Sequence, residues 1–280
     1  MREGRARGAP EPAAPARGLT GLRHDPIVAD RVTFIGHSTA LIELGSVRLL
    51  TDPVLRDRIL HIRRDADSPA EEVARDVDAV LLSHTHADHF DPSSVRRVDA
   101  PRLLVPEGAR RTLGRRGFRD LIEMGTGDSV NVAGVRVDAV PAKHDGRRVP
   151  LGPRFDAIGY VASRGDRRVY FAGDTAPFPA LADAVGAVDV ALLPIGGWGP
   201  KLHERHHLGP ETSAQLAAAI RPRIVIPIHW GTLLRIGLGS RRDEILERPL
   251  REFSDQLARL APGVELRALR PGESTLLDEA

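Results

Sequence analysis

Three imidazoles and one carboxylate lie close together in this chain, at His84, His86, Asp88 and His89. Imidazole nitrogen and carboxylate oxygen are ligands that zinc accepts, so this density of side chains indicates a divalent-metal site. The alternative interpretation is a polar loop that caps a helix, and few structural needs of that kind explain the density. The segment therefore predicts metal chemistry.

The elements around this motif support that prediction. The apolar residues 79–82 form an expected short buried strand. Because side chains alternate along an extended backbone, His84 and His86 should project to the same side and hold one metal ion. Asp88 and His89 follow in an expected turn and can reach a second position nearby. A helix should begin at residues 92–94, capped by Asp91 or a hydroxyl group.

This motif after an apolar strand resembles the signature of the metallo-β-lactamase superfamily. The resemblance extends over about residues 31–232 and implies further ligands, each directly after a strand. Three candidates follow in that order along the chain, namely His144, Asp174 and His229. Alone, His144 could be a loop residue and Asp174 a turn residue. Because all three residues directly follow expected strands, we interpret them as ligands.

The pattern of the superfamily distributes these side chains over a pair of metal ions. It gives His84, His86 and His144 to the first ion, Asp88, His89 and His229 to the second, and the bridging position to Asp174. Two zinc ions are the expected cofactors. Manganese and iron are alternatives because they accept similar ligand sets.

Shorter motifs narrow the resemblance to one branch. They are Gly-His-Ser-Thr at 36–39, Thr-Asp-Pro at 51–53, Leu-Pro-Ile-Gly-Gly at 193–197, His-His-Leu-Gly-Pro-Glu at 206–211 and Ile-His-Trp-Gly-Thr at 228–232. Together they are similar to the branch that contains N-acyl-phosphatidylethanolamine phospholipase D and ascorbate-6-phosphate lactonase, and more to the phospholipase. Ala87 and the short, charged stretch at 55–73 depart from the phospholipase pattern.

Further residues are expected close to the metals. Asp52 ends a strand and should accept a hydrogen bond from a ligating histidine, although a turn role is the alternative. His207 precedes an expected helix and should contact a substrate oxygen, unless it is a loop histidine. His37 is expected either beneath the metals or in a structural role, and Trp230 either in the pocket wall or in the core. His61 lies in no motif and should be exposed.

The expected chemistry is hydrolysis by a hydroxide that bridges two zinc ions, because a bound metal lowers the pKa of water to about 7. Asp88 would orient the hydroxide and His207 would stabilise the developing anion, so these two are the catalytic candidates. Cleavage of a phosphodiester, as by a phospholipase D, is the first hypothesis. A lactonase or other carbonyl hydrolase is the alternative, and a catalytically silent metal-binding module is the third.

Composition sets outer limits on these hypotheses. The chain has 280 residues and no cysteine, which excludes disulfides and thiolate zinc sites. Its 40 basic residues nearly balance 38 acidic ones, and the scattered arginines predict solvated faces and no nucleic-acid partner. No apolar stretch is long enough for a membrane span. We expect a cytoplasmic enzyme with a small or lipid-like substrate, and its oligomeric state stays open.

The order of the elements predicts an α/β fold, a four-layer αββα sandwich with the metals at one edge. Residues 1–22 should form a disordered tail and residues 23–280 one domain. The first sheet is expected to contain strands at 32–35, 40–44, 47–50, 79–82, 103–105, 120–124, 130–132 and 135–140. The second should contain strands at 157–162, 168–172, 188–193, 224–228 and 264–269. Helices are expected near 93–98, 106–113, 178–185, 211–220 and 250–260.

Overall fold

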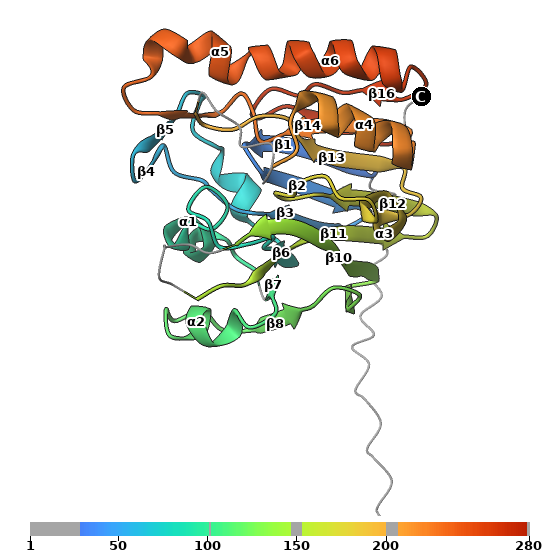
Figure 1. Cartoon of the computed structure of the whole chain (residues 1–280). Coiled ribbons are helices and arrows are strands. Elements are labelled where there is room, and N and C mark those ends of the chain that lie inside the picture. Colours follow the sequence, from blue (N-terminus) through green and yellow to red (C-terminus); the bar gives the residue numbers. More distant parts are fainter. Residues whose placement is uncertain (1–28, 101, 147–152, 200–206, 279–280) are drawn as a thin grey trace, which may run out of the picture.

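A computed structural model describes residues 29–100, 102–146, 153–199 and 207–278 (Figure 1). Two seven-stranded sheets pack face to face, and a small three-stranded sheet lies beside them. Helices cover the outer faces of the two large sheets, so the expected αββα sandwich is confirmed. The tail expected at residues 1–22 lies outside the described residues.

The first large sheet has the strand order β17-β1-β2-β3-β6-β7-β8. The strands are β1 (Arg31–Gly36), β2 (Thr39–Leu44), β3 (Val47–Thr51), β6 (Ala79–Leu81), β7 (Leu103–Pro106), β8 (Leu121–Met124) and β17 (Ser274–Leu276). Strands β2 and β3 form a hairpin in which Leu44 opposes Val47 across a two-residue turn. Gly45 in that turn has φ +58°, a conformation that glycine adopts without strain.

The second large sheet has the order β16-β14-β13-β12-β11-β10-β9. The strands are β9 (Ser129–Val132), β10 (Val135–Asp145), β11 (Asp156–Arg164), β12 (Arg167–Phe171), β13 (Val190–Pro194), β14 (Ile224–Ile228) and β16 (Glu265–Leu266). The expectation that residues 130–132 and 135–140 close the first sheet is wrong. They form a tight hairpin through Ala133 and Gly134, and β10 then pairs along β11, which commits both strands to the second sheet.

The small sheet has the order β15-β5-β4 and was not predicted. Its strands are β4 (Arg58–Ile59), β5 (Ile62–Arg64) and β15 (Leu233–Arg235). The helices are α1 (Pro92–Arg97), α2 (Arg110–Gly114), α3 (Leu181–Val185), α4 (Pro210–Ile220), α5 (Arg242–Leu246) and α6 (Arg248–Leu260), with 3-10 turns at Glu71–Ala74 and Gly239–Arg241. No helix in these described segments is long and apolar enough to cross a membrane.

Strand β6, which leads into the histidine motif, is buried on both faces. Ala79 and Leu81 join the core between the two sheets, whereas Val80 and Leu82 join a second core that includes residues of α1 and α2. This explains why the strand is apolar throughout and does not alternate. Packing on both sides holds the start of the following loop firmly, and α1 then begins where Asp91 accepts a hydrogen bond from the backbone N–H of Ser94 (2.9 Å). The predicted helix cap is confirmed.

Candidate metal centre

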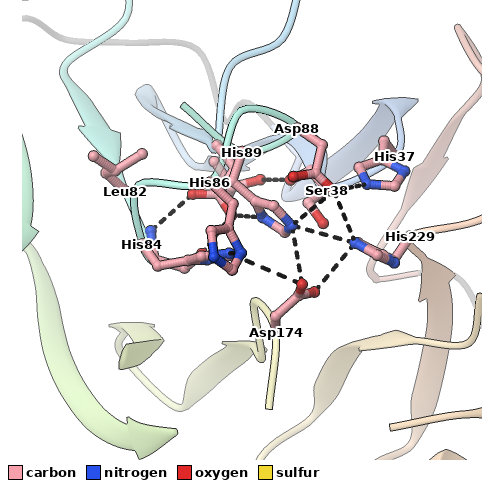
Figure 2. Close-up of polar contacts among 12 residues, drawn as sticks. His37, Ser38, Leu82, His84, His86, Asp88, His89, Asp174 and His229 are labelled. Atoms are coloured by element: carbon pink, nitrogen blue, oxygen red, sulfur yellow. Dashed lines mark hydrogen bonds and ion pairs between the residues drawn. The ribbon is translucent and has the colours of Figure 1, made fainter. Parts of the chain in front are cut away.

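Polar side chains from several strand ends meet at one edge of the sandwich (Figure 2). They come from the turn after β1, from the loop after β6, from the end of strand β10 and from the residues that follow β12 and β14. In each sheet the parallel strands direct their carboxyl ends to this edge, which is the usual place for ligands in such sheets.

The first group of side chains consists of three histidines. The Nδ1 atom of His86 lies 3.0 Å from the Nε2 atom of His84 and 3.0 Å from the Nε2 atom of His144. Zinc–nitrogen bonds of about 2.0–2.1 Å in a tetrahedron separate two ligand nitrogens by about 3.3 Å. The three ring nitrogens therefore have nearly the spacing that one tetrahedral cation requires.

The second group combines two histidines and a carboxylate. The Nε2 atoms of His89 and His229 lie 3.2 Å apart. The Oδ2 atom of Asp88 lies 3.7 Å from Nε2 of His229 and 3.9 Å from Nε2 of His89. All three side chains are buried, and their donor atoms lie within 4.8 Å of one another.

Asp174 contacts both groups. Its Oδ2 atom lies 3.2 Å from Nε2 of His89 and 3.9 Å from the Nε2 atoms of both His84 and His144. Its Oδ1 atom lies 3.3 Å from Nε2 of His229, yet it is buried without a hydrogen-bond donor. A buried carboxylate oxygen without a donor is costly. That cost disappears if a cation lies between the two groups, so the donor set fits a pair of divalent metals.

The electrostatics of the cluster keep its carboxylates ionised. Burial alone would raise the pKa of Asp174, but His229, His89 and His207 hold it well below its usual value. Burial and the neighbouring imidazoles His89 and His144 lower the pKa of His84 well below its usual value. Ionised carboxylates and neutral imidazoles are the forms that coordinate a metal.

The pKa of His89 is shifted in the opposite direction from that of His84. Burial would lower its pKa, but Asp174 and Asp88 raise the pKa of this imidazole well above its usual value. Without a cation, a proton on His89 compensates the surrounding carboxylates. A metal ion must displace that proton, so we expect metal binding to weaken as the pH falls.

Asp52 fixes the orientation of His89. It is fully buried and accepts hydrogen bonds from the backbone N–H of Ser83 (2.7 Å), the Ser83 hydroxyl (2.6 Å) and the Nδ1 atom of His89 (2.7 Å). Burial raises the pKa of Asp52, and its bonds to His89 and Ser83 oppose that rise. Because His89 donates through Nδ1, its Nε2 atom faces the cluster and is the one that a metal ion would coordinate once the additional proton leaves. The hydrogen bond expected from the sequence is present.

The same network reaches His84 through Ser83, a residue that the sequence analysis missed. The Ser83 hydroxyl has one proton, and it is donated to Asp52, which can only accept. The Nδ1 atom of His84, 2.9 Å from that hydroxyl, must therefore be the donor. Its Nε2 atom is then bare and faces His86, so one buried carboxylate sets the tautomers of two histidines.

His207 and His37 approach different carboxylates of the cluster. The Nδ1 atom of His207 lies 3.2 Å from Oδ2 of Asp174, and its side chain keeps 24% of its surface exposed. His37 is buried, its Nε2 atom lies 3.2 Å from Oδ2 of Asp88, and its ring centre is 3.9 Å from that of His229. Burial and His229 lower the pKa of His37 to about 3, so this imidazole is neutral.

The two tryptophans lie in different parts of the structure. Trp230 is buried in the main core, stacks on Phe34 and donates its indole N–H to the carbonyl of Pro227 (2.9 Å). Its contacts support the core role of the two alternatives. Trp198 was missed, although its indole N–H donates to Oδ2 of Asp88 (2.9 Å). An aromatic side chain shortly after the end of β13 is the signal that could have identified it.

Comparisons with known proteins agree with this geometry. The profile of the Beta-lactamase superfamily domain matches residues 47–230. The N-acyl-phosphatidylethanolamine-hydrolyzing phospholipase D 1 of Caenorhabditis elegans is 30% identical over 226 residues, which cover 71% of this chain and 63% of that protein. A UPF0173 metal-dependent hydrolase of Methanopyrus kandleri is 32% identical over 251 residues, covering 87% and 98%. The solved structure of the metallo hydrolase Igni18 of Ignicoccus hospitalis has a TM-score of 0.65 at 22% identity, covering 89% and 98%.

Proposed function

This chain is a metal-dependent hydrolase of the metallo-β-lactamase superfamily, and we propose that it holds two zinc ions and cleaves a phosphodiester. The observation that carries the dinuclear proposal is the position of Asp174. Its two oxygens approach nitrogens of both histidine groups within 3.2–3.9 Å. A carboxylate in that position can bridge two cations.

The ligand assignment follows from the two groups. His84, His86 and His144 would hold one zinc ion, and Asp88, His89 and His229 would hold the other, with Asp174 between them. Manganese or iron would fit the same donors, since selectivity also depends on supply. Elemental analysis of the purified protein identifies the metal.

Two zinc ions bound there would supply hydroxide at neutral pH and withdraw charge from a phosphoryl or carbonyl oxygen. Two side chains would have the remaining catalytic roles. Asp88 would orient the attacking nucleophile, because it is the only one of these carboxylates with more than 10% of its side chain exposed. His207, partly exposed beside Asp174, would donate a hydrogen bond to the oxygen that gains charge.

The substrate proposal has separate support. The nematode relative is named as a phospholipase D, but this chain spans 63% of its length, so that activity is proposed here and not transferred. Leu60 and Ile236 are the exposed large hydrophobic residues of the described structure, with 69% and 43% of their surface accessible. They lie at or beside the small sheet, so an apolar part of a substrate could rest there. A lactone remains the second candidate, since its carbonyl needs the same metals.

An activity screen tests the proposal. Zinc-loaded protein is assayed on bis(p-nitrophenyl) phosphate and on a panel of lactones, with His86→Ala as the metal-site control. We expect phosphodiester turnover that His86→Ala abolishes. Lactone turnover without phosphodiester cleavage rejects the phosphodiesterase in favour of the second candidate. Equal, near-zero rates for parent and variant on both panels favour a silent metal-binding module.

A further inference from the structure

The Oδ2 atom of Asp88 receives hydrogen bonds from two sides. The indole N–H of Trp198 donates to it over 2.9 Å, and the Nε2 atom of His37 lies 3.2 Å from the same oxygen. This is also the oxygen that approaches His229 and His89. One atom of the catalytic carboxylate therefore has a donor on the buried side, a donor on the open side, and the second group of nitrogens in front of it.

Asp88 needs such restraint more than the other carboxylates. Its side chain keeps 12% of its surface exposed, whereas the side chains of Asp52 and Asp174 keep 0% and 1%. A carboxylate at the open side can rotate toward water unless hydrogen bonds hold it. His37 is fixed from below, because its backbone N–H bonds to Thr232 and its carbonyl accepts from His229.

Trp198 is fixed from outside by the small sheet. Its carbonyl accepts a hydrogen bond from the backbone N–H of Arg235 in β15 (3.0 Å). The ring of His61 contacts the ring of Trp198 edge-on, with 5.3 Å between the ring centroids. The backbone N–H of Ile236 donates to the carbonyl of His61 (2.9 Å), so the two segments that contact Trp198 are bonded to each other. The indole of Trp198 is thus one physical link between the sheet β15-β5-β4 and the metal centre.

We propose that Trp198 is a positioning residue that, with His37, holds Asp88 in the orientation needed to bind the second zinc ion. The inference rests on the proposed dinuclear site and extends it to a residue outside the ligand set. The small sheet then has a function, namely to carry the donor on the open side. Loss of partners that orient metal ligands commonly weakens metal binding by about ten- to a hundredfold.

The test measures zinc affinity and needs no substrate. Metal-free protein is titrated with zinc against a chromophoric chelator, and the two macroscopic dissociation constants are compared between the parent and Trp198→Phe. We expect one of the two steps to lose about ten- to a hundredfold in the variant and the other to change less than threefold. The cobalt(II) spectrum of the substituted protein should lose one of its two sets of ligand-field bands in the same concentration range.

Two further variants separate the N–H group from the ring. Benzothienylalanine at position 198 keeps the shape of the indole and replaces its N–H by sulfur, so folding should be preserved even where Trp198→Phe fails to fold. It should reproduce the loss of affinity. His61→Phe is the matched control, because it removes an imidazole beside the site but keeps the aromatic contact and does not touch Asp88. Its zinc affinities should equal those of the parent.

Each outcome decides the inference. Parent-like zinc affinities in the benzothienylalanine protein overturn it, as does an equal loss in both steps, which would show a general structural effect. A parent that binds fewer than two zinc ions overturns both this inference and the dinuclear site. A parent that binds two zinc ions but cleaves no phosphodiester overturns only the substrate proposal, and the Trp198 result then stands by itself.

Discussion

Replacement of Asp52 by asparagine should impair zinc binding although residue 52 touches no metal. The substitution keeps the size of the side chain, and asparagine tolerates the positive φ of +33° at this position. The new amide can still accept the backbone N–H of Ser83. Its NH₂ group, however, replaces the oxygen that accepts from the Ser83 hydroxyl and from Nδ1 of His89.

The magnitude follows from the donors that lose a partner. With an NH₂ group opposite, His89 can avoid two facing donors only by moving its proton to Nε2, the atom that faces His229. A hydrogen bond to a charged group contributes about 1.5–3 kcal/mol, and about 1.4 kcal/mol corresponds to a factor of ten in affinity. We therefore expect Asp52→Asn to weaken the second zinc step about ten- to a hundredfold. Because Ser83 also loses the acceptor of its proton, a smaller loss should appear at His84.

Competition titration with zinc and thermal unfolding with and without zinc measure this effect. Asp91→Asn is the matched control, since Asp91 is also buried and accepts from a serine, but its other partner is Arg56 and not a histidine. It should lower the free energy of unfolding and leave both zinc affinities unchanged. If Asp52→Asn binds two zinc ions with parent affinity, the tautomer argument is refuted.

Three further predictions concern the surroundings of the centre. Gly173→Ala should destabilise the fold by about 1–3 kcal/mol more than Gly165→Ala and should weaken zinc binding. Both glycines have positive φ, but only at Gly173 would a Cβ atom lie 2.5 Å from Cβ of Ser83. Chemical unfolding of the two variants measures the difference. Burial would raise the pKa of Asp91, but its arginine and serine partners hold it below its usual value. Its contribution to stability is therefore complete above about pH 4 and is lost as the pH falls through the lower folded-state pKa. Asp91→Asn should accordingly flatten the acid limb of metal-free unfolding below about pH 4. Leu60→Ser should raise KM for a long-chain phosphodiester and leave bis(p-nitrophenyl) phosphate unaffected, which steady-state kinetics on both substrates would show; equal effects on both would contradict an apolar contact at Leu60.

Much of the candidate centre could be anticipated because its side chains follow strands. The two-residue period of an extended chain places His84 and His86 on one side, and the observed nitrogen spacing of 3.0 Å agrees. Asp174 and His229 each come directly after an apolar run that forms β12 or β14. Where a local pattern determines the geometry, the sequence alone is sufficient to predict where a side chain of the centre lies.

The features that were missed depend on contacts between distant segments. The alternating pattern of residues 135–140 suits either large sheet, and only the pairing of β10 with β11 decides between them. The strands of the small sheet span two or three residues and include arginines, so no apolar run reveals them. Trp198 shares no spacing with Asp88, and the small sheet that holds its backbone comes from distant segments of the chain.

The charge balance of the centre connects the fold to the proposed reaction. Three buried carboxylates, Asp52, Asp88 and Asp174, lie among imidazoles that are neutral when they coordinate a metal. One divalent cation would leave a net negative charge in a site with little water, which is costly. Two divalent cations bring four positive charges against three negative ones, and the hydroxide that the proposed reaction requires takes up the remaining charge. The charges therefore balance only when both ions are bound, which makes the second ion, and with it the orientation of Asp88 by Trp198 and His37, necessary for the proposed reaction.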